Sequence, residues 1–347
     1  MKSILHIYPS ISGGGAEVVA NTIAKHQTLH FKVIVATYFS SEQKIFEDVT
    51  FSTLEKKNGL LGLLSTIRQI KYKLKEFEPS AIISHLTYMN IASVLAIKMS
   101  GKKIKHIAVA HTPNPWRRGL PWRIIERYTY NNCICVCISN EVSSYLLEEL
   151  GIKKTEILAN PIEFTTSKNI KNLRKDGSDF QLIAIGRNVP VKNYPFLINA
   201  FSYLPDRFKL DIYGAEVDKN LSVMLDVLNL NKRITFQGFK DRKELMANLH
   251  NYDAFVMASD KEGEPLALLE AAANGVTIIG RNTPGLGKAI KKVGGFLLGE
   301  DEDEEAFSIL IEEVVSSFKS NTVSIDTWKE QHNTQNASHL YCELLNE

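Results

Sequence analysis

The sequence predicts an α/β protein built from two doubly wound parallel-sheet domains. Its 347 residues exceed what one hydrophobic core of ordinary size supports. Short apolar runs alternate with helical stretches along the chain, which is typical of parallel sheets with crossover helices. The alternation restarts after one polar, turn-rich segment. We therefore expect a first domain over residues 1–165, a linker over 166–178, a second domain over 179–322 and a C-terminal helix over 323–347 that crosses back to the first domain.

The first half begins with a strand–helix–strand unit. A strand over 3–8 leads through a glycine-rich turn over 9–15 to a helix over 16–26, and a second strand follows over 31–38. A basic amphipathic helix is expected over 60–77. Four more apolar runs predict strands over 81–85, 104–111, 133–139 and 155–159.

The helix over 60–77 has two open interpretations. Its apolar stripe, from Leu63 to Leu74, is flanked by Arg68 and three lysines. Such a helix can lie on an anionic membrane surface, but it more often packs its stripe on a sheet and exposes its charges. The net charge of the whole chain is only +2, which argues against a nucleic-acid partner.

The second half repeats the alternating pattern. Five apolar runs, each followed by a helical stretch, predict strands over 180–186, 208–214, 233–238, 252–259 and 276–280.

Several classes of protein are disfavoured by what the sequence lacks. No run approaches the length of a membrane-spanning helix, and the N-terminal residues lack an apolar signal core, so a cytoplasmic protein is expected, with association at the inner face of the membrane left open. Cys133, Cys135 and Cys137 alternate with aliphatic residues and lack the C-x-x-C spacing of zinc ligands. They are therefore interpreted as part of a buried strand.

The segment S-D-K-E-G-E-P-L-A-L-L-E-A-A-A-N-G, residues 259–275, contains the strongest functional signal. Pro265 suits the first turn of a helix and Gly275 the left-handed position after its end, so a helix of about ten residues is expected between them. Glu262 then precedes the helix, and Glu270 lies a little over one turn inside it. A helix N-terminus binds anions, and the amides expected to point from this one belong to Gly263, Glu264 and Leu266.

Two carboxylates beside an anion site are suited to hydroxyl groups, so this segment predicts a site for a sugar nucleotide. Taken alone, Glu262 and Glu270 are equally consistent with an acidic helix start and a solvated helix face.

Loops after other predicted strands supply further candidates. Arg187 and Lys192 follow the first strand of the second domain, where two cations can hold a diphosphate, although such residues taken alone are more often solvated loop cations. His111 follows a strand of the first domain, and ligands of open parallel sheets bind at the carboxyl ends of strands. The run of glycines that ends in Gly14 and Gly15 lacks the G-x-G-x-x-G spacing of a dinucleotide site, which disfavours a nicotinamide-dependent oxidoreductase.

Together these motifs resemble the retaining glycosyltransferases of family 4, also described as group 1 glycosyl transferases. The resemblance covers nearly the whole chain and rests on E-G-E-P-L-A-L-L-E, G-R-N-V-P-V-K-N and G-G-G-A-E, with further matches at 157–163, 234–239 and 294–298. It implies the GT-B fold, in which two Rossmann-like domains face each other across a cleft. Two departures are Ala215, where a second glycine is common, and Lys288, where glutamate is common.

The resemblance also implies a role for each motif. Arg187 and Lys192 would hold the donor diphosphate, and Glu270 would bind the ribose hydroxyls. Glu262 would contact the donor sugar, and His111 would lie near the reacting sugar, so that Glu262, His111, Arg187 and Lys192 form the catalytic set. Other residues implied to line the donor site are Gly14, Gly15, Gly214, Phe239, Gly263, Glu264, Pro265 and Leu266.

The implied mechanism is transfer with retention through an oxocarbenium-like transition state. Arg187, Lys192 and the helix amides would neutralise the leaving diphosphate. No metal or other cofactor is expected, since the only Asp-x-Asp, at Asp301 to Asp303, lies in an acidic run away from any predicted strand end.

Three functions are compatible with these observations. The leading hypothesis is transfer of a sugar from a nucleotide-diphosphate sugar, UDP-linked, to a glycan or polyprenyl-diphosphate-linked acceptor in bacterial surface polysaccharide synthesis. The alternatives are a sugar-nucleotide epimerase of the same fold and a non-catalytic peripheral membrane adaptor. Turnover of the donor alone would indicate the epimerase, and failure to bind any nucleotide would favour the adaptor.

Overall fold

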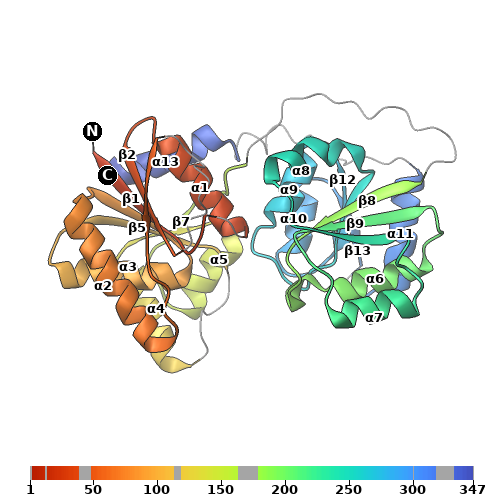
Figure 1. The fold of residues 1–347 in the computed structure, drawn as a ribbon, viewed down its shortest axis with the longest axis horizontal. Coiled ribbons are helices and arrows are strands. Elements are labelled where there is room, and N and C mark those ends of the chain that lie inside the picture. The colour runs from red at the N-terminus through yellow and green to blue at the C-terminus, as the bar shows by residue number, and fades with distance from the viewer. Residues whose placement is uncertain are drawn as a thin grey trace. The chain divides into compact units, whose positions relative to one another are not determined.

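A computed structural model of the protein describes residues 2–11, 14–38, 48–112, 119–162, 179–299, 301–317 and 332–346. The chain divides into two compact units, one formed by residues 1–161 and 331–347 and the other by residues 162–330. Each unit contains one sheet with helices on both of its faces (Figure 1). The linker expected over 166–178 lies outside the described residues.

The first unit is built on a seven-stranded sheet with the order β3-β2-β1-β4-β5-β6-β7. All of its described strand pairs are parallel. Its strands are β1 (Ser3–Ile7), β2 (Lys32–Thr37), β3 (Val49–Thr53), β4 (Ala81–His85), β5 (Lys105–Ala110), β6 (Ile134–Cys137) and β7 (Glu156–Ile157). Its helices are α1 (Gly15–Gln27), α2 (Gly59–Phe77), α3 (Thr87–Ser100), α4 (Leu120–Tyr130), α5 (Asn140–Ser144), a π-helical turn (Tyr145–Glu149) and α13 (Thr334–Asn346).

Alternating side chains of the first sheet face two helical layers, which follows from the period of two along a strand. In β2, Val33 and Val35 pack in a cluster with α1, whereas Ile34 packs in a second cluster with α2 and α3. The apolar stripe of α2, from Leu63 to Leu74, is buried in this second cluster. The interpretation of α2 as a helix packed on the sheet is therefore confirmed for its stripe, while its charged side remains exposed.

The second unit contains a six-stranded parallel sheet with the order β10-β9-β8-β11-β12-β13. Its strands are β8 (Phe180–Ile185), β9 (Phe208–Tyr213), β10 (Ile234–Gly238), β11 (Ala254–Met257), β12 (Thr277–Arg281) and β13 (Phe296–Leu298). Its helices are α6 (Tyr194–Tyr203), α7 (Lys219–Val227), α8 (Arg242–Asn248), α9 (Leu266–Ala273), α10 (Leu286–Lys292) and α11 (Glu304–Ser316), with 3₁₀ turns at Pro190–Lys192 and Leu249–Asn251.

Each sheet has one switch point, at which the order of the strands reverses, and this point determines where a ligand can approach. The strand order reverses between β1 and β4 in the first unit and between β8 and β11 in the second. The loops that leave the carboxyl ends of two such strands diverge to opposite faces, which opens a crevice between them. The loops after β8 and β11 carry Lys192 and Glu262, and the loop after β1 carries Gly14 and Gly15.

Three remaining expectations can be compared with the described residues. The C-terminal helix is described from Thr334, as α13, and it contacts α1. Asp303, of the predicted acidic run, is the N-cap of α11, where its side chain accepts a hydrogen bond from the Ala306 N–H at 3.0 Å. Among the described helices, none has both the length and the apolar character that a membrane crossing requires.

Candidate functional site

Asp260 ties together the two loops at the switch point of the second unit. Its N–H donates to the Val191 carbonyl at 2.9 Å, and its carboxylate accepts from the side-chain amide of Asn193 at 2.8 Å. Arg281, at the end of β12, pairs with the same carboxylate at 2.7 Å. Asn193 has a left-handed φ of 48° and also caps α6. These bonds fix the turn after β8 against the loop after β11.

Lys192 and Glu262 meet between these two loops. The Lys192 ammonium lies 2.8 Å from Oε1 of Glu262, and the two side chains are 19% and 14% exposed. Gly186 makes room for this contact, because a Cβ there would lie 2.9 Å from Cε of Lys192. Arg187, the other predicted cation, is exposed in the same loop. The structure thus brings Lys192, from the loop after β8, into contact with Glu262 of the segment 259–275.

The backbone of Glu262 is held by the loop before α10. Its N–H donates to the Pro284 carbonyl at 3.0 Å. Gly285 packs directly against the Glu262 carbonyl, since a Cβ at Gly285 would lie 1.8 Å from that oxygen. Gly285 also has a φ of +79°, which favours glycine. The position of Glu262 therefore depends on a glycine in a different loop.

Helix α9 begins one residue later than the sequence predicts. Pro265 is its N-cap rather than part of its first turn, and the helix has eight residues rather than about ten. Its end is as predicted, because Gly275 has a φ of +77° and donates to the Ala272 carbonyl at 2.9 Å. Gly263 and Glu264 precede the helix, and Leu266 is its first residue.

Glu270 is buried inside α9 and is paired with Arg242, the first residue of α8. The Glu270 side chain is 5% exposed and that of Arg242 is 31% exposed. A carboxylate with so little access to water needs a cation or several donors to remain ionised. The contact with Arg242 supplies that cation at the edge of the site.

Gly214 and Phe239 follow the strands on the other side of β8. The Gly214 N–H donates to the Gly238 carbonyl at 2.8 Å, and Gly214 has a φ of +77°. A Cβ on Gly214 would lie 3.5 Å from the backbone of Gly186, so the ends of β8 and β9 approach closely. The Phe239 ring is 75% exposed beside them.

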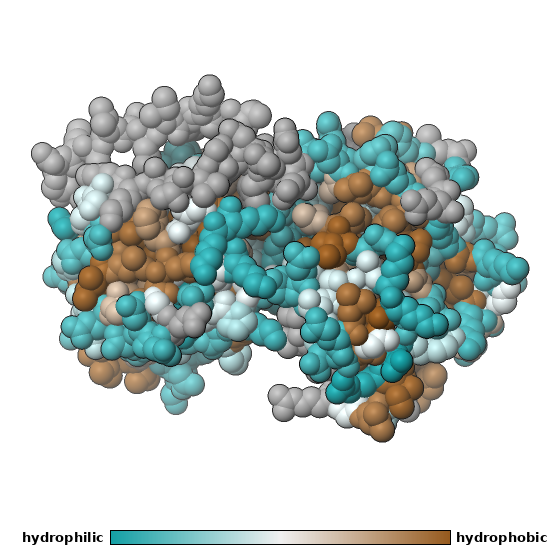
Figure 2. All heavy atoms as spheres, turned by 180° about the vertical axis from the view of Figure 1, so that it is seen from behind, coloured by the Kyte–Doolittle hydropathy of each residue, from teal (hydrophilic) through white to brown (hydrophobic). Residues whose placement is uncertain are grey.

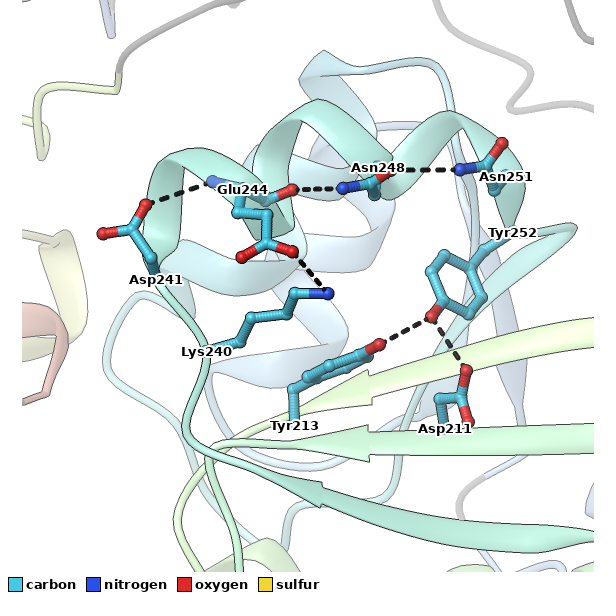
Figure 3. Close-up of polar contacts among 8 residues, drawn as sticks. All are labelled: Asp211, Tyr213, Lys240, Asp241, Glu244, Asn248, Asn251 and Tyr252. Atoms are coloured by element: carbon cyan, nitrogen blue, oxygen red, sulfur yellow. Dashed lines mark hydrogen bonds and ion pairs between the residues drawn. The ribbon is translucent and has the colours of Figure 1, made fainter.

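Polar contacts surround the end of β9 and the start of α8 (Figure 3). The Tyr252 hydroxyl donates to Asp211 at 2.8 Å and lies 3.1 Å from the Tyr213 hydroxyl. Burial and these bonds raise the pKa of Tyr252 well above its usual range. Lys240, next to Phe239 in the sequence, pairs with Glu244 at 2.9 Å and lies over the ring of Tyr213. These contacts join the end of β9 to Tyr252 and the residue after Phe239 to α8.

In the first unit, Gly14 is the N-cap of α1 and Gly15 is its first residue. Gly13 lies outside the described residues. Asn21 connects the loop to the helix, because its side-chain amide donates to the Ile11 carbonyl at 2.7 Å and its oxygen accepts from the Tyr8 hydroxyl at 2.7 Å.

His111 follows β5 directly and is 8% exposed. Its Nε2 lies 3.1 Å from Nδ1 of His85, the last residue of the neighbouring β4. Burial lowers the pKa of His111 to about 3, so its imidazole is neutral at neutral pH.

Sequence reasoning did not identify Arg242 or His85. His85 ends an apolar run just as His111 does, and histidines at the ends of two neighbouring strands lie at one edge of a sheet, so the sequence contained a signal. Arg242 gave no such signal, because its contact joins two helices through residues 28 positions apart.

Two family descriptions match the chain. Residues 13–165 match Glycosyltransferase Family 4, and residues 165–327 match Glycosyl transferases group 1. The Escherichia coli O-antigen biosynthesis glycosyltransferase WbnH is 25% identical over 319 residues, which is 89% of each chain. The Escherichia coli UDP-Gal:alpha-D-GlcNAc-diphosphoundecaprenol alpha-1,3-galactosyltransferase is 26% identical over 194 residues, 51% of this chain and 50% of its own. The crystal structure of Anabaena Alr3699/HepE in complex with UDP-glucose has a TM-score of 0.81 at 19% identity, with both chains fully covered.

Proposed function

This chain belongs to family 4 of the glycosyltransferases and has the GT-B fold with a group 1 domain, and on that premise we propose that it transfers a sugar from a UDP-sugar to a glycan acceptor with retention of configuration. Two relatives support a UDP-linked donor, since one is named for UDP-Gal and a structural neighbour is described with UDP-glucose. The name of WbnH supports a role in surface polysaccharide synthesis.

The contact between Lys192 and Glu262 is the observation that carries this proposal. It places a cation and a carboxylate 2.8 Å apart at the switch point of a parallel sheet, where such folds bind ligands. A sugar nucleotide has a group for each, a diphosphate for Lys192 and sugar hydroxyls for Glu262. The side chains are also mostly shielded from water, which strengthens their interaction with a ligand.

The remaining predicted residues are given the following roles in this proposal. Arg187 extends from the same loop as Lys192 and supplies a second cation for the diphosphate. The backbone N–H groups of Gly263, Glu264 and Leu266, at the start of α9, interact with the same diphosphate. Glu270 receives the ribose hydroxyls. Gly214 and Phe239 line the side toward β9 and β10, and Gly14 and Gly15 allow backbone to approach the donor or acceptor.

The proposed chemistry is dominated by charge on the leaving group. As the glycosidic bond breaks, negative charge develops on the departing UDP, and positive charge develops on the sugar. Lys192, Arg187 and the amides at the start of α9 stabilise the first, because fixed cations and dipoles act without reorganising. Glu262 and His111 contact the sugar. No metal ion takes part in this proposal.

The acceptor is proposed to be linked to a polyprenyl diphosphate, with α2 and α4 contacting an anionic membrane surface. Leu61 and Leu64 of α2 and Leu120 and Ile124 of α4 are all exposed. Both helices contact α3, and each also exposes basic residues. Figure 2 shows, for the side of the molecule opposite to the view of Figure 1, apolar areas bordered by hydrophilic side chains. The exposed basic residues of the two helices are Arg68, Lys71, Lys75, Arg123 and Arg127.

A vesicle experiment tests the membrane contact. The protein should sediment with vesicles that contain an anionic lipid, less so at high salt, and not with neutral vesicles. The paired change Leu61→Ser and Leu64→Ser should weaken sedimentation without changing activity on a water-soluble acceptor. Equal sedimentation of this variant and the wild type would contradict the assignment of α2.

A nucleotide panel tests the donor site. UDP at about one hundred times its Kd should raise stability by roughly 2.7 kcal/mol, which is readily seen as a rise in melting temperature. GDP and ADP serve as comparisons. Glu270→Ala should abolish the rise, whereas Glu262→Ala should preserve it and lose turnover. If none of the three nucleotides stabilises the protein, the proposal is wrong.

The transfer reaction itself requires an acceptor. Product formation from the UDP-sugar alone, without an acceptor, would indicate epimerisation and overturn the transfer step. The anomeric configuration of the product, measured by NMR, tests retention directly.

A further inference from the structure

Three buried histidines occupy neighbouring strands at the switch point of the first unit. His6 lies in β1, His85 ends β4, and His111 follows β5. His6 and His85 are fully buried, and His111 is 8% exposed. Of these three, only His111 was expected from the sequence to meet a substrate, so the other two need an explanation.

His85 is in contact with rings on both sides. Its Nδ1 lies 3.1 Å from Nε2 of His111. On its other side, the His6 ring stacks on it with a centroid distance of 6.4 Å and an interplanar angle of 16°. The Tyr8 ring meets it edge-on at 6.1 Å. These neighbours restrict the orientation of the His85 ring, and the contact with His111 in turn orients the ring of His111.

The hydrogen bond between the two histidines also selects a tautomer. Burial, together with the neighbouring His111 and His6, lowers the pKa of His85 well below its usual range, so its ring carries one proton. Nε2 of His85 is buried without a hydrogen-bond partner among the described residues. A buried N–H without an acceptor is rarer than a buried acceptor without a donor. The proton of His85 is therefore on Nδ1, and His85 donates to His111.

This hydrogen bond also determines the tautomer of His111. Its Nε2 accepts from His85, so the single proton of its neutral ring is on Nδ1. Nδ1 is the ring nitrogen that His85 leaves free to meet a ligand, and the accessible part of His111 makes such a contact feasible.

We propose that His85 is a positioning residue for the transfer reaction, which holds His111 in the tautomer and orientation that present its Nδ1–H to an oxygen of the substrate. The inference rests on the proposed function, because it assumes that His111 contacts the transferred sugar. His6 packs against the His85 ring and is itself held by a 2.7 Å hydrogen bond between its Nε2 and Oε1 of Gln27.

Kinetics of matched variants test the role of His85. His85→Phe keeps an aromatic ring in the stack but removes the hydrogen bond, and it should lower kcat about tenfold with little change in the KM of the donor. His85→Asn retains a side-chain amide near the position of Nδ1, and it should recover most of the lost kcat. An equal loss in both variants would overturn the proposal.

His106 offers a control in the same sheet. It is buried in β5, next to β4, and its Nε2 bonds to Ser84 at 2.7 Å rather than to His111. His106→Phe removes a buried imidazole and its hydrogen bond in the same way, so it should reduce stability while leaving kcat unchanged. If His106→Phe lowers kcat as much as His85→Phe, the effect of His85 is only structural and the proposal is wrong.

Direct observation of the ring protons tests the tautomer without any assay of activity. In protein labelled with ¹⁵N histidine, the long-range ¹H–¹⁵N spectrum should show the His111 proton on Nδ1, with the signal assigned through His111→Asn. Loss of the single tautomer is expected in His85→Phe. A proton on Nε2 of His111 in the wild type would overturn the proposal. If no UDP-sugar and acceptor give turnover, the proposed function fails, and the spectrum still decides whether His85 orients His111.

Discussion

Breaking the pair between Arg242 and Glu270 gives the sharpest test of how the proposed donor site is built. Removing the partner of a fully buried charge costs about 3–5 kcal/mol. The Glu270 side chain is 5% exposed, whereas Arg242 is 31% exposed and is already partly screened by water. We therefore expect Arg242→Met to lower the free energy of unfolding by about 2–4 kcal/mol, a large part of the stability of an ordinary domain.

A double-mutant cycle separates this effect from loss of packing. Glu270→Met combined with Arg242→Met replaces both charges by apolar side chains, so no uncompensated carboxylate remains. The double variant should be more stable than Arg242→Met alone. The free energies come from urea unfolding at pH 7 followed by circular dichroism.

Lys209→Met is the matched control in the same unit. It breaks an ion pair of 4.0 Å with Asp179, whose side chain is 51% exposed, and it should change stability by less than about 1 kcal/mol. Two results would refute the reasoning: a loss in Arg242→Met no larger than in this control, or additive effects of the two changes at positions 242 and 270.

Three further predictions follow from other contacts. Gly285→Ala should destabilise the protein in urea by more than about 2 kcal/mol, since its Cβ would lie 1.8 Å from the Glu262 carbonyl at a φ of +79°; an unchanged midpoint would contradict that packing. Burial lowers the pKa of His6 to about 4 and of His106 and His111 to about 3, so the unfolded chain takes up protons below pH 6.5 while the folded chain does not. The contribution of these histidines to the free energy of unfolding should be fully present above pH 6.5. Below that pH the free energy should fall by about 1.4 kcal/mol per pH unit for each histidine, down to about pH 4. Equal urea midpoints at pH 7 and pH 5 would exclude this dependence. Glu262→Gln should bind UDP about tenfold more tightly by calorimetry yet turn over more slowly, because it frees Lys192; weaker binding of UDP would show that Glu262 helps to hold it.

Elements with strong local signals were predictable from the sequence. The eleven predicted strands are all present, and most of them have a continuous apolar run, which a strand covered on both faces requires. β3 was missed, since Val49–Thr53 lies at the edge of its sheet and contains no residue that is fully buried. β13 was missed because Phe296–Leu298 is too short to show a period.

The site could be predicted only in part, for a physical reason. The loops that carry the candidate residues could be predicted, because the topology of a parallel sheet brings the loops after its strands to one edge. Side chains that hold them in place were not found, because the contacts of Asp260 with Asn193 and Arg281 depend on how the loops fold over one another. Gly285 and Arg242 belong to the same class.

The charges at the proposed donor site explain why positioning requires these additional residues. Without a ligand, Lys192 is paired with Glu262 and Arg242 with Glu270, so each carboxylate has a cation within direct contact. A diphosphate that approaches Lys192 must compete with Glu262 for it, and the two anions repel each other unless Glu262 turns to a hydroxyl group. The transferred sugar of an intact donor provides that hydroxyl. Free UDP lacks this sugar, and its ribose hydroxyls are assigned to Glu270. Intact donor and released UDP therefore differ in how well they satisfy Glu262, and this difference favours holding the donor and releasing the nucleotide product.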